Sequence, residues 1–259
     1  MAVFAISDLH LSTANAQKSM DVFGQRWSMY TERLEKNWRA LVRENDTVII
    51  PGDISWELSL EGAAADFHFI DRLPGKKIIS KGNHDFWWST VKKMIAFFER
   101  ESISSISLLH NNAYEVEDFI IAGTRGWYQD EHCENMPANA DFEKLISREA
   151  GRLKTSLDCA LALQKASDTP KEILVFLHFP VIWNGKCCQP LLDILENYGI
   201  RRCFFGHIHA NYAQARILDY EDKMRLELIS SDFLEFIPQI IRPISAKTEK
   251  ISSLSIDIS

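Results

Sequence analysis

The chain has 259 residues, of which 46% are hydrophobic and 25% are charged, and its formal net charge is −7. This length is typical of one α/β unit, so we expect a single domain over residues 1–259. Proteins that coat nucleic acid need many cations to neutralise phosphates, and the acidic balance disfavours that class. A small phosphate-bearing substrate is compatible with the charge, because a bound metal supplies positive charge locally.

Targeting and redox signals point to the cytoplasm. The N-terminal residues MAVFAISDLHLS contain no basic segment and reach an aspartate at position 8, unlike a signal peptide. No apolar run approaches the roughly 18 residues of a membrane span. The five cysteines are an odd number and form no C-x-x-C pair, which is typical of free thiols in a reducing compartment. We expect a cytoplasmic protein with no membrane partner.

The first half of the chain alternates apolar strands with amphipathic helices. An apolar run at 3–7 predicts a buried strand, and a loop rich in small and polar residues follows to about 26. Leu34, Trp38 and Leu41, spaced by three and four residues, predict a helix over 28–44. The next predicted elements are a strand from 47, a helix over 60–73, a strand from 76 and a helix over 89–100.

The second half ends in hairpins. It predicts short strands over 104–124, a helix over 141–166, a strand over 172–178, a helix over 189–199, a strand from 201, and paired strands at 213–220 and 224–231. Residues 245–259 allow either a last strand or a loose tail. Alternating strands and helices followed by hairpins predict a layered α/β fold.

Polar residues with metal-binding side chains follow five of the predicted strands. They are Asp8 and His10, then Asp53, then Asn83, His84 and Asp85, then His178, and finally His207 and His209. Each group alone is compatible with an ordinary turn or strand end. In open α/β sheets, however, ligands bind beyond the carboxyl ends of the strands, so five such groups predict one shared site.

The residue types indicate a transition-metal centre. Imidazole suits zinc and iron, and oxygen ligands suit harder ions such as manganese. Two aspartates, four neutral histidines and one asparagine carry a charge of −2. Two divalent ions would make the centre positive, and such a centre attracts phosphate within an acidic protein. Paired ions can also stabilise the attacking and leaving oxygens of an in-line displacement.

These motifs resemble those of the calcineurin-like metallophosphoesterases, whose order is D-x-H, G-D, G-N-H-D or E, H and G-H-x-H. The corresponding segments here are SDLH at 7–10, GDIS at 52–55, GNHD at 82–85, HFP at 178–180 and GHIH at 206–209. Order and spacing match from residue 7 to residue 209. The resemblance implies an α/β fold built as a four-layer α/β/β/α sandwich with two central mixed sheets.

The resemblance also implies a role for each motif residue. Asp8, His10 and His209 would hold a first ion, Asn83, His178 and His207 a second, and Asp53 would bridge the two. His84 would lie near the substrate as the catalytic proton donor, and Asp85 would orient it. The ions would be two divalent or trivalent metals: manganese, iron or zinc.

The predicted activity is metal-dependent hydrolysis of phosphomonoesters or phosphodiesters of a small substrate, including nucleotide-type esters, by a hydroxide that two metals activate. A nuclease is the alternative within enzymes, and the acidic charge argues against it. A non-catalytic scaffold with the same fold would have no need for the complete ligand set. The sequence leaves the oligomeric state open.

Substrate-binding residues are less sharply marked. Arg125 could clamp a phosphate and Trp127 or Tyr128 could stack on a base, while a packed loop with a solvated arginine explains the same residues. Trp56, Trp87 and Trp88 are interpreted as core residues. The loop at 11–27 either covers the metal site or packs on the surface.

Overall fold

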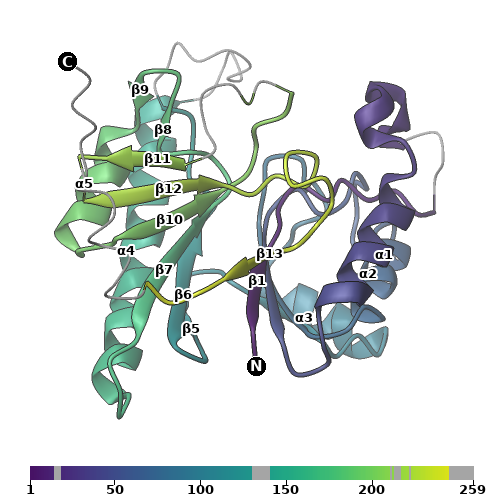
Figure 1. Ribbon diagram of the computed structural model, residues 1–259, viewed down its shortest axis with the longest axis horizontal. Coiled ribbons are helices and arrows are strands. Elements are labelled where there is room, and N and C mark those ends of the chain that lie inside the picture. The colour runs from purple at the N-terminus through teal and green to yellow at the C-terminus, as the bar shows by residue number, and fades with distance from the viewer. Residues whose placement is uncertain (15–18, 130–140, 211, 213–216, 222, 245–259) are drawn as a thin grey trace, which may run out of the picture.

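The computed structural model describes residues 1–14, 19–129, 141–210, 212, 217–221 and 223–244. Two β-sheets face each other at its centre, and helices cover both outer faces (Figure 1). This arrangement confirms the predicted α/β/β/α sandwich with two mixed sheets. Among the described residues, no helix is long and apolar enough to cross a membrane.

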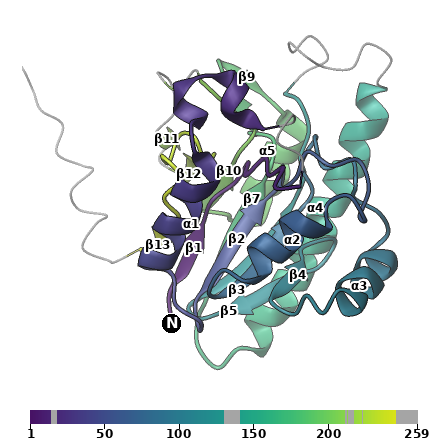
Figure 2. The same ribbon diagram turned by 90° about the vertical axis from the view of Figure 1, so that its right-hand side faces the viewer.

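The first sheet is built from the N-terminal half of the chain and one late strand. Its order is β13 (Gln239–Ile241), β1 (Val3–Ala5), β2 (Thr47–Pro51), β3 (Lys76–Ser80) and β4 (Ile106–Leu108). The strands β1 to β4 are parallel, and β13 is antiparallel to β1. The helices α1 (Tyr30–Leu41), α2 (Ala64–Asp71) and α3 (Val91–Arg100) cover its outer face (Figure 2).

The second sheet contains six strands. Its order is β11 (Ile217–Tyr220), β12 (Met224–Leu228), β10 (Arg202–Phe205), β7 (Glu172–Leu177), β6 (Phe119–Thr124) and β5 (Tyr114–Val116). The two edge strands are antiparallel and the inner four are parallel. The helices α4 (Phe142–Ala166) and α5 (Gln189–Asn197) lie on its outer face (Figure 1).

Three hydrophobic clusters separate the four layers. Strand side chains alternate, so Phe4 faces the helices whereas Val3 and Ala5 face the other sheet. The cluster between the sheets contains residues of both, among them Val3, Ala5, Ile49, Ile78, Ile121, Leu174, Phe176 and Phe204. Burial on both faces explains why the parallel strands read as unbroken apolar runs.

The two sheets meet where β1 and β12 end. The Ser7 N–H donates to the Ile229 carbonyl at 2.8 Å, and the Ser231 N–H donates to the Ser7 carbonyl at 2.8 Å. This junction brings the carboxyl end of the first sheet against that of the second. The polar strand ends of both sheets therefore face one another.

Several predicted bounds differ from the structure. The helix predicted over 60–73 is shortened to Ala64–Asp71, because residues 60–63 form turns. The sequence did not predict β13, which is only three residues long and lies between Pro238 and Pro243. The hairpin of β8 (Ile182–Trp183) and β9 (Lys186–Cys187) was also missed. Residues 213–216 and 245–259 lie outside the described part of the chain.

Candidate metal centre

The predicted ligands lie on unusual backbone. Positive φ angles occur at Asp8 (58°), His10 (46°), Asp53 (51°) and His207 (68°). Such angles are uncommon for residues other than glycine and persist only where the surroundings enforce them. Here the Asp8 N–H donates to the Gly52 carbonyl at 3.1 Å, and the His10 N–H donates to the Asp53 carbonyl at 2.9 Å. The strand-end loops thus hold one another in the strained form.

Two motif glycines allow the loops to approach closely. A Cβ atom at Gly82 would collide with the carboxylate and backbone of Asp53, and one at Gly206 would collide with the Asp8 carboxylate. Neither neighbour can move without displacing a predicted metal ligand. The glycines of G-N-H-D and G-H-x-H are therefore required by close approach.

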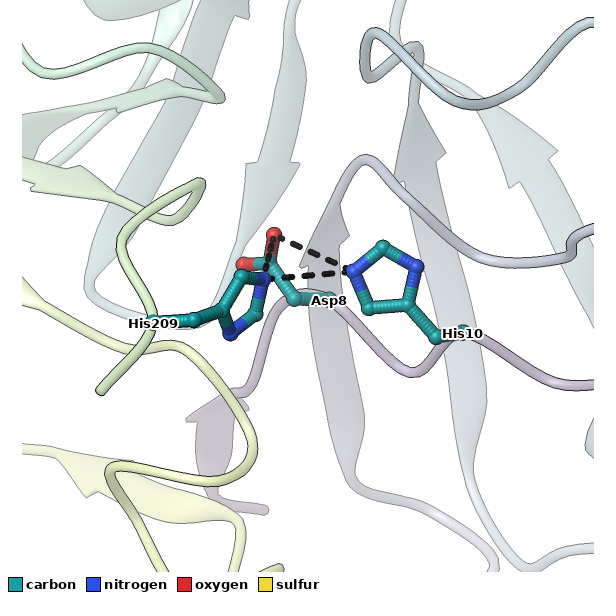
Figure 3. A group of neighbouring side chains, drawn as sticks. All are labelled: Asp8, His10 and His209. Atoms are coloured by element: carbon teal, nitrogen blue, oxygen red, sulfur yellow. Dashed lines mark hydrogen bonds and ion pairs between the residues drawn. The ribbon is translucent and has the colours of Figure 1, made fainter. Parts of the chain in front are cut away.

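The first cluster comprises Asp8, His10 and His209 (Figure 3). His209 Nε2 lies 3.2 Å from His10 Nε2 and 3.5 Å from Asp8 Oδ1. His209 Nδ1 lies 2.8 Å from Asp232 Oδ1, which leaves Nε2 directed into the cluster. The three ligand atoms lie within 4.8 Å of one another, so they can hold one ion.

The second cluster comprises Asn83, His178 and His207. Asn83 Oδ1 lies 2.7 Å from His178 Nε2 and 2.9 Å from His207 Nδ1. His178 Nδ1 faces the Pro51 carbonyl at 3.1 Å, which leaves Nε2 for a ligand. The structure therefore brings together all three residues predicted for the second ion.

Asp53 lies between the two clusters. Its Oδ2 atom is 3.7 Å from His10 Nε2 and 3.4 Å from His178 Nε2. Asp8 also faces both sides, because Asp8, Asp53 and His178 form a second group with ligand atoms within 4.8 Å. From the sequence, only Asp53 was predicted to face both ligand clusters.

The electrostatics of the centre fit bound cations. Burial lowers the pKa of His10 to about 4 and that of His207 to about 3. Burial opposes charge on His178 and His209 as well, yet neighbouring carboxylates raise their pKa values to about 9 and about 10. The buried carboxylates thus stabilise positive charge nearby, and the uncharged imidazoles of His10 and His207 have nitrogen lone pairs that can bind a metal. This donor set fits a transition metal.

The sequence profile of the calcineurin-like phosphoesterases matches residues 1–211. The chain belongs to this family. Among solved structures, it is similar to the phosphopantetheinyl hydrolase PptH from Mycobacterium tuberculosis, with 14% identity, a TM-score of 0.53, and coverage of 94% of this chain and 96% of that one. It is also similar to the protein TT1561 of Thermus thermophilus, with 11% identity, a TM-score of 0.52, and coverage of 93% and 97%. At such identities these likenesses show the fold alone. A search among curated proteins finds no significant match.

In this calcineurin-like phosphoesterase, His84 lies beside the centre. Its ring centroid is 5.7 Å from that of His10 and 4.5 Å from that of Trp56. Its backbone N–H donates to Asp53 Oδ1 at 2.8 Å, which ties it to the residue between the clusters. Burial lowers the pKa of His84.

The role predicted for Asp85 needs correction. Its buried carboxylate accepts bonds from backbone N–H groups of Gly82, Asp53 and Ile54 at 2.8–2.9 Å, and from Trp87 Nε1 at 3.0 Å. Within the described residues, no hydrogen bond joins it to the His84 ring. Asp85 therefore fastens the G-D loop to the G-N-H-D loop. It acts on His84 only through the backbone.

Two tryptophans pack against the first cluster. The Trp56 ring stacks on His10 at 4.8 Å with an interplanar angle of 24°, so its interpretation as a core residue was incomplete. Trp27, at the end of the 3₁₀-helix η3 (Gln25–Trp27), is buried, and its ring lies 5.6 Å from that of His209. The end of the 11–27 loop thus covers the metal site. Phe23, in the preceding 3₁₀-helix η2 (Met20–Phe23), is 67% exposed.

The substrate-binding residues predicted after β6 lie in different environments. Trp127 is buried against Phe179 and Tyr128, so its predicted stacking on a base is wrong. Gly126, with a φ of 72°, turns the chain back into the core at this point. Arg125 is partly exposed, lies 4.5 Å from the centroid of the Trp127 ring, and pairs with Glu149 at 3.6 Å.

Sequence reasoning missed Asp232. It follows β12 and accepts from the Tyr212 hydroxyl with Oδ2, while Oδ1 faces His209. Ser230 and Ser231, just before it, donate hydroxyl bonds to Asp8. In the sequence, Asp232 belongs to a sixth polar strand end, Ser-Ser-Asp at 230–232. This strand end was not assigned to the site because the late hairpin was expected to be antiparallel.

Proposed function

We propose that this calcineurin-like phosphoesterase uses two metal ions to hydrolyse a phosphomonoester or phosphodiester of a small molecule, including nucleotide-type esters. The observation that carries the proposal is the position of Asp53, whose Oδ2 atom faces one histidine of each cluster at 3.4 and 3.7 Å. A carboxylate between two ligand sets is suited to bridging two ions. Mixed imidazole and oxygen ligands favour manganese, iron or zinc.

Bound ions of this kind supply a nucleophile at neutral pH, by lowering the pKa of water, and offset negative charge that develops on the phosphoryl oxygens. The protein's own part is to position the substrate and handle the leaving group. His84 lies beside the centre without belonging to either cluster, and its N–H bond to Asp53 fixes its place. We assign it the transfer of a ring proton to the leaving oxygen.

Asp85 supports that step indirectly. By accepting N–H bonds from Gly82 and Asp53, it fixes the distance between the loop that carries His84 and the bridging carboxylate. Trp56 stacks on His10 and packs against His84, and it limits the rotation of both rings. These contacts pre-organise the centre before substrate arrives.

The substrate partner in this proposal is a small phosphoester, with nucleic acid disfavoured by the net charge of −7. The proposed compartment is the cytoplasm. Support comes from Cys159, Cys187 and Cys203, which form no disulfide in the described structure.

The deciding experiment measures bound metal and substrate range together. Purified protein is analysed for transition metals, reconstituted with manganese, iron or zinc, and assayed on nitrophenyl phosphate, bis-nitrophenyl phosphate, cyclic nucleotides and dinucleotides. We expect close to two ions per chain and activity that chelators remove. Chelator-resistant activity in metal-free protein would overturn the two-metal proposal. Bound metal without hydrolysis of any ester would favour a scaffold, and cleavage of oligonucleotides alone would favour a nuclease.

A further inference from the structure

A cavity of about 380 Å³ opens beside the metal centre, between the carboxyl ends of β3, β4 and β6 and the first half of α4. Four cationic side chains line it, and one carboxylate, that of Glu149, accompanies them. Lys81, Arg125, Arg148 and Arg152 are the cations. Three positive charges are therefore left unbalanced in a protein whose net charge is negative.

The carboxylate in the cavity is already engaged. Glu149 is 1% exposed, accepts the Thr124 hydroxyl at 2.6 Å, and lies 2.6 Å from Arg152 and 3.6 Å from Arg125. In the part of the chain that the structure describes, neither Lys81 nor Arg148 forms an ion pair. Arg125 Nε is buried and lacks a hydrogen-bond partner. The cavity thus offers donors and charge that an anion could satisfy.

One residue from each sheet connects the cavity to the metal centre. Lys81 directly precedes the G-N-H-D motif at the end of β3. On the other sheet, the Arg125 carbonyl accepts the His178 N–H at 3.0 Å. A small molecule with one phosphate at the metals could therefore extend into the cavity.

We propose that the cavity binds a second phosphate group of the substrate, so that the enzyme acts on small molecules carrying two phosphates. This inference rests on the proposed phosphoesterase function and narrows its substrate class. Guanidinium groups bind phosphate oxygens through paired N–H bonds, and three arginines share this cavity. Its volume suits part of a small ligand. Hydrolysis of one ester would release inorganic phosphate, and the second phosphate would remain on the alcohol product.

Titration with inorganic phosphate tests the cavity without assuming the rest of the substrate. Metal-loaded protein should bind two phosphates per chain, one at the metals and one in the cavity. Arg148→Gln and Lys81→Gln should each weaken only the second event, by about ten-fold or more. Lys154→Gln is the matched control, since it removes an exposed cation from the same helix α4 but outside the cavity. It should retain both events.

Kinetics then test the substrate class. The ratio of kcat/KM for fructose 1,6-bisphosphate over fructose 6-phosphate, and for adenosine 3′,5′-bisphosphate over AMP, should exceed one in the wild type for at least one pair. Arg148→Gln should lower that ratio about ten-fold, and Lys154→Gln should leave it unchanged.

The outcomes separate this inference from the function on which it rests. One phosphate per chain in every variant, or equal effects of Arg148→Gln and Lys154→Gln, would overturn the cavity assignment even if nitrophenyl phosphate is hydrolysed. If no ester is hydrolysed but the second phosphate binds and depends on Arg148, the cavity stands and the proposed function fails.

Discussion

The two ligand clusters differ in charge although they lie side by side. The first cluster contains a carboxylate, that of Asp8, and a second carboxylate, Asp232, lies behind His209 at 2.8 Å. The second cluster of Asn83, His178 and His207 has an amide oxygen in place of a carboxylate. Negative charge therefore gathers at the first cluster. The second ion would stay more electron-deficient, which favours its binding the phosphoryl group.

The clusters also differ in their surroundings. Trp27 and Trp56 pack on the first, with ring distances of 5.6 Å to His209 and 4.8 Å to His10. On the second, the Phe179 ring lies 4.3 Å from that of His207. The comparison teaches that two neighbouring ligand clusters can differ in charge and in packing although Asp53 lies between them. We expect substitutions near the two clusters to differ in how strongly they lower metal content and turnover.

The largest effect is expected for Asp53→Ala. This change removes a carboxylate oxygen that lies 3.7 Å from His10 of the first cluster and 3.4 Å from His178 of the second, so both ions should be lost together. His10→Ala should deplete mainly the first ion, because the second cluster is untouched. The depletion should be partial, because Asp8 and His209 remain. Elemental analysis and turnover of the two variants, measured side by side, check the difference.

Retention of both ions and near-normal turnover in Asp53→Ala would contradict the bridging role. Asp118→Ala, in the exposed turn before β6, serves as the control for loss of one carboxylate, and it should keep full metal content.

The next largest effect concerns His84, which belongs to neither cluster. His84→Asn should keep both ions and lose about 10²–10⁴-fold in rate, the usual contribution of general acid catalysis. The loss should be larger for esters with an alkoxide leaving group than for nitrophenyl esters, since nitrophenolate needs little protonation. Rates on a nitrophenyl ester and a nucleotide ester, with metal content, test this. Equal losses on the two esters would leave His84 as a phosphate-binding group.

Asp85→Asn should give a smaller loss with less leaving-group dependence. Its contacts are to backbone N–H groups of Gly82, Asp53 and Ile54, so the change loosens the loops and leaves the His84 ring intact. A leaving-group dependence as steep as that of His84→Asn would contradict this assignment.

Asp232→Asn tests the inequality of the clusters directly. It removes the charge behind His209 and should lower affinity for the first ion by about 10–100-fold, as loss of such supporting groups does. The second ion should remain. Tyr212→Phe is the control, because it removes the hydroxyl on the other Asp232 oxygen and keeps the carboxylate. Metal retention during stepwise chelation distinguishes the variants, and equal loss of both ions would contradict the assignment.

The sequence predicted that these side chains would converge, because their signals are local. Asp8 and His10, for example, follow a short apolar strand, and the carboxyl ends of parallel strands must converge. The same reasoning failed for Asp232, since β12 was expected in an antiparallel hairpin. It is antiparallel to β11 but parallel to β10, so its end also points to the centre.

Other features depended on contacts that sequence spacing does not encode. Trp127 follows β6 at the site edge, yet the turn at Gly126 buries it against Phe179. Asp85 is adjacent to His84 in sequence, but its bonds are to loops from another strand. The cationic cavity is formed by β3, β6 and α4, whose lining residues lie up to 71 positions apart, from Lys81 to Arg152. No short motif could reveal it.

The smallest effect is expected when the metals are removed, which should change how the stability of the protein depends on pH. Without metal, neighbouring carboxylates raise the pKa of His178 to about 9 and that of His209 to about 10, from about 6.5 when unfolded. A raised pKa stabilises the folded protein fully below pH 6.5, and this contribution is lost as pH rises through 9 and 10. Chelated protein should thus lose Tm between pH 7 and 10, by a few degrees for each kcal/mol lost.

Metal-loaded protein should show the opposite trend at the low end of the range. The ions need these imidazoles neutral, so metal affinity and the Tm gained from it should fall as the pH drops below neutrality. In chelated His209→Gln, the decline at high pH should be smaller and confined to the range in which His178 loses its proton. Thermal unfolding with and without chelator, from pH 6 to pH 10, measures all three curves. If the chelated wild type and His209→Gln lost the same Tm over this range, the raised pKa of His209 could not be stabilising the first cluster.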